Sequence, residues 1–352
     1  MIGGVDPPKK ANLQRTHAEA SESATPEPKL PATLLAAVVT ISGSEGAGTG
    51  FICNYHGKPY VATNQHVLEV GSPFAIRTSA NDLIVPQQIV AATDEDIILI
   101  QCASIPTGIK PLEIAPLPDA FIQSGNRLCI PGNSKGDGVI TQTSGKLLAV
   151  GPQRIEVDNP VYPGNSGSPI IDISTGKVIG VLTEAELVTL NQFEKESFRS
   201  KNSCIKSEIR YFGYRLDAVQ GWESLNWQLF QQNELLIKQS REELDDIFVY
   251  FTDSSDRYKN FQKLFVARNA AAVIYNDKNH SLEDKIEAYN RLLRDIASFA
   301  RNAKSRVNNR KIYFCQQNSA DTIYRMSDGI TEGTELAARD DDLFETLLQR
   351  GN

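Results

Sequence analysis

The sequence predicts a mostly β domain followed by an α-helical domain, and three observations support this division. Between Ala32 and about Val219, short apolar runs alternate with Gly, Pro, Asn and Asp, a spacing typical of a sandwich or barrels rather than of a βαβ fold. After about Asp217, turn residues become rare and apolar residues recur at helical intervals. A length of 352 residues also suggests two domains. We therefore expect a β domain over 32–219 and a helical domain over 220–352.

The first 31 residues are rich in Pro, Ala, Ser, Glu and Lys and show no apolar period. Such a segment buries too little apolar surface to offset the entropy lost on ordering, so we expect a disordered tail or linker. Its start lacks the basic-then-apolar layout of a secretory signal. Two alternatives stay open, namely a cytoplasmic chain and one whose signal has been removed.

The β domain is expected from twelve short runs of strand-forming residues. They are Ala36–Ser42, Thr49–Tyr55, Lys58–Thr63, Phe74–Thr78, Ile84–Ala91, Ile97–Ala103, Arg127–Ile130, Val139–Val150, Arg154–Val157, Pro169–Asp172, Val178–Glu184 and Arg210–Leu216.

Four helices are expected after the strands. A long amphipathic helix covers 222–251, a second covers 256–275, a third begins at Ser281 and a fourth covers 334–349. Ser281 can cap the free amides of the third helix. The apolar face of this helix is expected to carry Leu282, Ile286, Tyr289, Leu293, Ile296 and Phe299.

The composition excludes several functional classes. The chain has 43 acidic and 36 basic residues, which gives no electrostatic reason to expect nucleic acid or an anionic membrane as a partner. The longest apolar run, Leu34–Ile41, is of strand length, so no membrane span is expected. The cysteines are odd in number and show no metal-ligand spacing, which favours buried thiols over a disulfide framework. They are Cys53, Cys102, Cys129, Cys204 and Cys315.

The strongest local signal is the stretch GNSGSP over residues 164–169, which an apolar run follows. A serine hydroxyl attacks a peptide carbonyl only where it is exposed at a sharp turn, and the oxyanion that develops needs backbone N–H groups aimed at it. Glycines on both sides of Ser166 permit that turn. Alone, however, such a stretch is more often a surface turn.

Two upstream residues can act with this serine. His66 follows an apolar strand, at a position where a base can face a cleft, whereas His17, His56 and His280 have no comparable surroundings. Asp96 directly precedes the apolar run 97–100, where a carboxylate can accept the second N–H of the base and fix its tautomer. We interpret the neighbouring acids, at 94 and 95, as solvated turn residues.

Together these motifs resemble the trypsin-like serine peptidases of the chymotrypsin clan, and their compact spacing resembles the bacterial HtrA/Deg branch. The resemblance covers about residues 32–219. It is carried by the order His, Asp, Ser and by the phrases TGF at 49–51, ATNQHV at 62–67, DIILI at 96–100, GNSGSP at 164–169 and GVLT at 180–183.

The resemblance implies two six-stranded antiparallel β-barrels with the site in the groove between them. His66 and Asp96 would lie on the first barrel and Ser166 on the second. It also implies an oxyanion hole built from the N–H groups of Gly164 and Ser166, with Asn165 between them.

The resemblance further implies where a substrate would bind. The edge formed by Thr183, Glu184 and Ala185 would pair with a substrate strand. Pro160 would form the floor of the specificity pocket, with Leu182 and Phe212 as apolar walls. The nearest acids, Asp158 and Glu184, are expected to point toward solvent or the cleft rim.

This sequence also departs from the family pattern. No cysteine flanks His66, so the disulfide that many secreted relatives carry beside the histidine cannot form, and no PDZ module is recognisable after residue 219. The family resemblance implies a periplasmic or secreted location, although a cytoplasmic one stays open. We expect the helical domain to pack on the peptidase domain or to mediate oligomerisation or partner binding.

Three hypotheses follow. The first is a serine endopeptidase acting on unfolded or exposed polypeptide segments through Ser166, His66 and Asp96, with no metal or organic cofactor. The second is a catalytically silent protein of the same fold that binds polypeptides or a partner. The third places the function in the helical domain, which is less favoured because 220–352 lacks a cluster of ligand or catalytic residue types.

Overall fold

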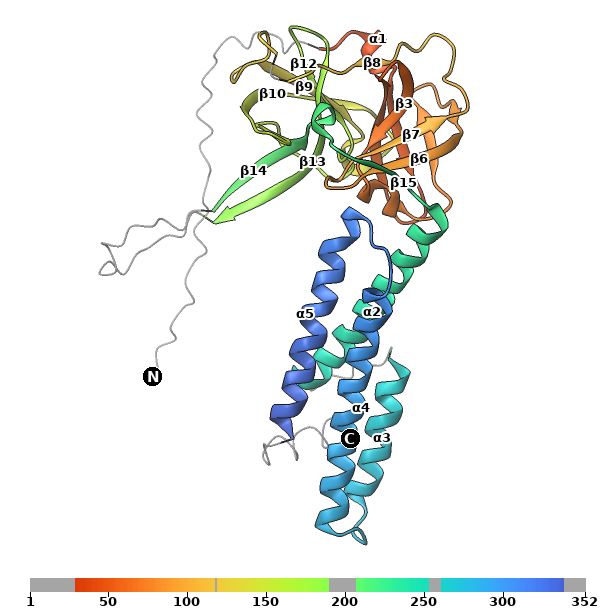
Figure 1. Ribbon diagram of the computed structural model, residues 1–352, viewed down its shortest axis with the longest axis vertical. Helices are drawn as coiled ribbons and strands as arrows, with labels where there is room; N and C mark the ends of the chain where they lie inside the picture. The colour runs from red at the N-terminus through yellow and green to blue at the C-terminus, as the bar shows by residue number, and fades with distance from the viewer. Residues whose placement is uncertain (1–28, 118, 190–206, 253–260, 339–352) are drawn as a thin grey trace, which may run out of the picture.

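The computed structural model describes residues 29–117, 119–189, 207–252 and 261–338. Figure 1 shows a β part at one end of the molecule and a bundle of helices that projects from it. The predicted mostly β fold with a C-terminal helical region is thereby confirmed.

The first sheet has nine strands and coils into half a barrel, with strand order β15-β6-β7-β3-β2-β1-β4-β5 and β8 beside β2. The sequence predicted a closed six-stranded barrel here, and the structure shows this open sheet instead. One reason is that the chain passes from β5 to β6 through the single residue Val85, so these neighbours in sequence cannot form a ladder with each other. The strands are β1 Val38–Ser42, β2 Ala47–Tyr55, β3 Lys58–Thr63, β4 Ala75–Thr78, β5 Leu83–Ile84, β6 Pro86–Ala92, β7 Ile98–Cys102, β8 Leu112–Glu113 and β15 Trp222–Ser224.

The second sheet is the predicted closed barrel of six strands. Its last hairpin, formed by β13 and β14, is longer than expected and continues beyond the barrel (Figure 1). The first and last residues of the expected polar loop 186–208 therefore belong to the strands of this hairpin. Residues 190–206 lie outside the described residues. The strands are β9 Arg127–Gly132, β10 Thr141–Val150, β11 Arg154–Val157, β12 Pro169–Asp172, β13 Val178–Thr189 and β14 Ser207–Tyr214.

The helical region differs from the prediction at its start. Residues 222–224 pair with β6 as β15, so the first long helix begins at Trp227 rather than at 222. The side chain of Asn226 accepts a hydrogen bond of 3.0 Å from the Leu229 amide and caps this helix. The long helices are α2 Trp227–Thr252, α3 Gln262–Asn276, α4 Leu282–Asn308 and α5 Phe314–Ala337, and the short ones are α1 Ala32–Leu35, η1 His66–Val70, η2 Ser134–Gly136 and η3 Leu216–Ala218.

The two later helices were predicted unequally well. Ser281 caps α4 as expected and accepts the Asp284 amide at 3.1 Å. Of the expected apolar face, Tyr289, Leu293 and Ile296 are buried and Phe299 packs against them, whereas Leu282 and Ile286, in the first turns, are exposed.

Helix α5 was not predicted from the sequence; the helix expected at 334–349 overlaps only its last turn, and 339–352 lies outside the described residues. Its buried residues follow a regular three-four spacing, but three of the seven are polar, which hides the period. They are Gln316, Ala320, Ile323, Ser327, Ile330, Thr334 and Ala337.

The β part and the helical region share a hydrophobic core. Phe230 of α2 and Tyr313, directly before α5, belong to the same buried cluster as Phe51 of β2. Because β15 also completes the first sheet, the start of the helical region packs with the β part, whereas the rest of the helices form a buried cluster of their own. None of the described helices is long and apolar enough to cross a membrane.

Four of the five cysteines lie in the described ranges, and none of them forms a disulfide there; they are Cys53, Cys102, Cys129 and Cys315. Burial raises the pKa of the Cys102 thiol to about 11, so this group is an unreactive thiol at neutral pH. Cys204 lies outside the described residues.

Candidate active site

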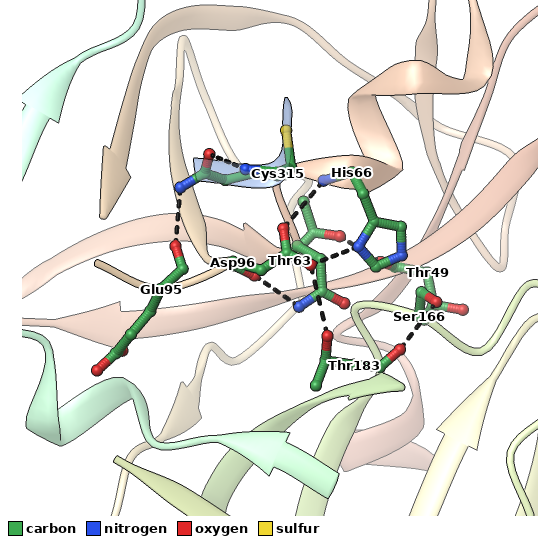
Figure 2. Close-up of polar contacts among 10 residues, drawn as sticks. Thr49, Thr63, His66, Glu95, Asp96, Ser166, Thr183 and Cys315 are labelled. Atoms are coloured by element: carbon green, nitrogen blue, oxygen red, sulfur yellow. Dashed lines mark hydrogen bonds and ion pairs between the residues drawn. The ribbon is translucent and has the colours of Figure 1, made fainter. Parts of the chain in front are cut away.

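His66 and Asp96 lie together at the ends of two adjacent strands. His66 begins η1 shortly after β3, and Asp96 comes just before β7, which pairs with β3. Nδ1 of His66 lies 2.5 Å from Oδ2 of Asp96, and the backbone amide of His66 donates to Oδ1 at 3.0 Å (Figure 2). Because Asp96 holds both the ring and the main chain of His66, it fixes the orientation of the imidazole.

The two other acids before β7 behave differently from Asp96. Asp94 is exposed and accepts a hydrogen bond from the hydroxyl of Thr93. Glu95 was expected to be solvated, but its side chain is only 2% exposed and one of its oxygens has no partner among the described residues. Burial, and secondarily the charge of Asp94, raise the pKa of Glu95 to about 7. The solvated interpretation of Glu95 is therefore wrong, because its side chain turns into the interior.

Ser166 lies at the tip of a tight turn between two glycines with left-handed backbone, Gly164 at φ 92° and Gly167 at φ 85°. A Cβ atom on Gly167 would lie 2.0 Å from the carbonyl oxygen of Thr49, so only glycine fits there. The hydroxyl of Ser166 donates to the carbonyl of Thr183 at 3.3 Å. This turn is the one predicted from the sequence.

Thr183 connects the serine with the acid. Its carbonyl accepts the hydroxyl of Ser166, and its own hydroxyl donates to Oδ2 of Asp96 at 3.4 Å (Figure 2). One residue of β13 therefore contacts a group from each sheet. The structure brings the three predicted catalytic side chains to one place between the two sheets.

Thr49 supports the serine turn from the first sheet. Its hydroxyl donates to the carbonyl of Gly164 at 2.7 Å, and its amide donates to the carbonyl of Ser166 at 2.9 Å. The same hydroxyl accepts the amide of Asn133 at 2.9 Å. Thr49 was not predicted as a site residue, because nothing near it in the sequence indicates a contact with a residue 115 positions away.

The backbone around the expected oxyanion hole is held by the loop that contains η2. The amide of Lys135 donates to the carbonyl of Pro163 at 2.7 Å. The N–H group of Gly164 belongs to the same trans peptide and must point in the opposite direction. In the described part of the chain, neither the Gly164 amide nor the Ser166 amide donates to a main-chain carbonyl. Asn165 is buried, and its Oδ1 accepts the hydroxyl of Ser134 at 2.8 Å, so its side chain anchors the turn.

Two expected pocket walls are corrected. Leu182 is completely buried among the interior residues of the second barrel, so it belongs to the core. Phe212 lies outside that interior cluster, and the guanidinium groups of Arg154 and Arg210 lie 4.4 and 5.1 Å from its ring centre. Tyr211, its neighbour, packs against the interior cluster instead. Successive side chains along a strand point to opposite faces, so Phe212 and Tyr211 lie on opposite faces of β14, and Phe212 was expected on the wrong one.

The other expected binding residues are more accessible. Pro160 is exposed, and the next residue, Val161, packs against the interior cluster of the second barrel. Ala185 is exposed on β13, while the side chain of Glu184 lies outside the described residues. Asp158 is exposed, and its carboxylate accepts the backbone amide of Lys146.

Within the described ranges, no group of three or more His, Cys, Asp or Glu side chains is arranged to hold a metal ion.

Comparisons with known proteins agree on the peptidase part. Residues 48–181 match the family described as trypsin-like peptidase domain. The chain is 24% identical over 150 residues to Protease Do-like 1, chloroplastic, of Arabidopsis thaliana, a match that covers 40% of this chain and 33% of that protein. It is 32% identical over 145 residues to the uncharacterized protein y4bJ of Sinorhizobium fredii, covering 40% of this chain and 22% of that protein. The chain thus spans about a third or less of the length of these relatives.

Among solved structures, an inactive mutant form of Rv3671c from M. tuberculosis matches with a TM-score of 0.39 and 18% identity, covering 53% of this chain and 85% of that chain. The serine endoprotease from Yersinia pestis matches with a TM-score of 0.35 and 20% identity, covering 44% of this chain and 58% of that chain. Residues 48–181, less than half of the chain, are thus similar to a trypsin-like peptidase domain.

Proposed function

We propose that this protein is a serine endopeptidase that hydrolyses peptide bonds through Ser166, His66 and Asp96. The observation that carries the proposal is the contact of Asp96 with both His66 and Thr183, while Thr183 accepts the hydroxyl of Ser166. A carboxylate that fixes the histidine tautomer next to an exposed serine is the arrangement that activates a hydroxyl nucleophile.

The reaction begins when the hydroxyl oxygen of Ser166 attacks the scissile carbonyl carbon and Nε2 of His66 takes the hydroxyl proton. The negative charge that develops on the substrate oxygen is stabilised by the N–H groups of Gly164 and Ser166. His66 then returns the proton to the leaving amine, and the acyl group remains on Ser166. Water attacks this ester with His66 again acting as base, which releases the acid and the free serine.

The substrate is an unfolded or exposed polypeptide segment. Only an extended chain can add as a strand to the edge formed by Thr183, Glu184 and Ala185, and folded proteins rarely present such segments. On its other side this part of β13 pairs with β14. The proposal places the protein in the periplasm or outside the cell, in keeping with the family resemblance.

A serine-reactive fluorophosphonate probe tests the mechanism, because it labels only an activated serine. We expect the full chain to be labelled and to degrade an unfolded protein, and Ser166→Ala to lose both activities. Ser144→Ala, in β10, is the matched control and should keep both. Equal labelling of the Ser166→Ala variant, or no labelling of the wild-type chain, would contradict the proposal and favour a silent polypeptide-binding protein.

A further inference from the structure

Gln65, the residue before His66, connects the histidine with the segment that carries Asp96. Its side chain is completely buried. Its Nε2 donates to the carbonyl of Ala92 and to the carbonyl of Glu95, each at 2.8 Å. Ala92 is the last residue of β6, and Glu95 lies in the connection between β6 and β7, which contains Asp96. Gln65 therefore fixes the main chain of the acid relative to the main chain of the base.

The same side chain reaches the helical region. Oε1 of Gln65 accepts a hydrogen bond of 3.4 Å from the backbone amide of Cys315, which lies 250 residues further along the chain (Figure 2). Cys315 is the second residue of α5. The first amides of a helix have no partner within the helix and carry its partial positive charge. A side chain next to the candidate catalytic histidine thus satisfies one of these amides.

The beginning of α5 is held firmly in this place. The hydroxyl of Tyr313 accepts the amide of Asn226 at 2.8 Å, and the ring of Tyr313 lies in the core shared with the first sheet. Nε2 of Gln316 donates to Oε1 of Glu234 on α2 at 2.6 Å. The first turn of α5 therefore cannot shift relative to Gln65 without breaking buried contacts in the helical region.

A second contact joins the same turn to η1. The side chain of Cys315 lies near the carboxyl group of Glu69, three residues after His66. The amide of Cys315 thus binds the residue before His66, and its side chain lies near a residue that follows His66. A change in the packing of α5 would therefore shift Gln65 and Glu69, which flank His66, and with them the histidine.

We propose that Gln65 is a positioning residue, through which the first turn of α5 holds His66 and Asp96 in their reactive arrangement. The inference rests on the proposed peptidase function and adds the helical region to the support of the catalytic centre. Since Gln65 is buried behind the histidine, its loss lowers turnover and leaves substrate binding nearly unchanged.

A pair of variants at one position isolates the amide of Cys315. Cys315→Ala removes the thiol and keeps the N–H group, whereas Cys315→Pro removes both, and proline is tolerated in the first turn of a helix. We expect the kcat of the proline variant to be about tenfold lower than that of the alanine variant, with KM within about twofold. Equal kcat values for the two variants, with folding verified by thermal denaturation, would overturn the inference.

A substitution at Gln65 completes a double-mutant cycle. Gln65→Met removes all three hydrogen bonds at similar size and should lower kcat by at least about tenfold. Gln88→Met, on the exposed part of β6, is the matched control and should have wild-type kcat. Adding Cys315→Pro to Gln65→Met should cost little more if α5 acts through Gln65, whereas multiplied losses would show an independent route and contradict the inference.

The outcomes separate this inference from the proposed function. A wild-type chain without fluorophosphonate labelling at Ser166 refutes the peptidase itself. A labelled, active wild-type chain together with a Gln65→Met variant of unchanged kcat refutes only the positioning role, and this comparison decides even where the proline variant does not fold.

Discussion

The hydroxyl of Thr49 donates a hydrogen bond of 2.7 Å to the carbonyl of Gly164 and so joins the half-barrel to the serine turn of the closed barrel. It also accepts the amide of Asn133, which belongs to the loop that orients the Pro163–Gly164 peptide. One side chain therefore supports the expected oxyanion hole from two directions.

Thr49→Val keeps the shape of the side chain but removes both hydrogen bonds. We expect kcat to fall by about tenfold or more, and the free energy of unfolding to fall by about 1–3 kcal/mol, because the Gly164 carbonyl and the Asn133 amide lose their partner. Thr49→Ser keeps the hydroxyl and is the control. Steady-state kinetics and urea denaturation measure both effects, and wild-type turnover in Thr49→Val would contradict this role.

Asp96→Asn is expected to lower kcat by about 10⁴-fold, because an amide at this position cannot accept both N–H groups of His66 and favours the wrong tautomer. Asp94→Asn provides a control two residues away, where the carboxylate accepts a hydrogen bond from Thr93, and should retain nearly full activity. If Asp94→Asn proves the more sensitive variant, the assignment of the orienting acid is wrong.

The raised pKa of Glu95 predicts that the free energy of unfolding depends on pH. Folding raises its pKa from the ordinary 4.5 to about 7, so between these values the folded state binds more protons than the unfolded state. The contribution of Glu95 to the free energy of unfolding is therefore fully present below pH 4.5 and is lost as the pH rises to about 7. Glu95→Gln mimics the protonated form and should be more stable than the wild type at pH 8, by at most about 3 kcal/mol.

Urea denaturation at pH 5 and pH 8 measures this difference. We expect the gain from Glu95→Gln to be small at pH 5 and larger at pH 8, while Asp94→Gln, at an exposed position, should show a much smaller change. A gain that is equal at both pH values would contradict a raised pKa.

A chain cut after Val219 should lose stability and tend to aggregate. The cut removes β15 from the edge of β6, and it removes Phe230 and Tyr313 from the shared core, which exposes apolar surface. We expect the fragment 29–219 to be less stable than the full chain by at least about 3 kcal/mol, as measured by denaturation and light scattering. A soluble and fully active fragment would show that the two regions are independent.

The catalytic candidates were predictable because each carries a local signal. His66 and Asp96 follow or precede apolar strands, and Ser166 lies between glycines, so a strand edge or a turn is visible in a few residues. The supporting residues carry no such signal. Thr49 and Gln65 act through partners 115 and 250 residues away, and only the folded chain shows which of many polar side chains meet.

The errors in the fold have similar physical causes. The two-residue β5 and the three-residue β15 are too short for a periodic pattern, so the first sheet was expected to be a simple barrel. Helix α5 has small polar residues such as Ser327 and Thr334 at its buried positions, where they pack closely on α4 without an apolar signature. Phe212 and Tyr211 are both aromatic, and composition alone does not tell which one faces the barrel interior.

The pocket for the residue before the scissile bond determines which peptide bonds are cleaved. Cleavage after Lys or Arg requires a carboxylate in the pocket, because desolvation of an unpaired cation costs several kcal/mol. Pro160 cannot supply one, and the carboxylate of Asp158 is bound to the backbone of Lys146. Val161, next to Pro160, and Tyr211 are partly buried apolar side chains that pack against the interior cluster of the second barrel.

We therefore expect cleavage after small or medium apolar residues such as Ala, Val and Leu, with about 1–3 kcal/mol of discrimination per methylene. Tyr211→Ala should enlarge the pocket and shift the preference toward Leu or Phe by about tenfold in kcat/KM, whereas Phe212→Ala, on the opposite face of β14, should leave the preference unchanged. Sequencing the products of an unfolded protein digested by each variant measures these preferences. A profile dominated by Lys and Arg would refute the apolar pocket, and a shift in Phe212→Ala alone would restore Phe212 as its wall, but neither result would affect the assignment of Ser166, His66 and Asp96.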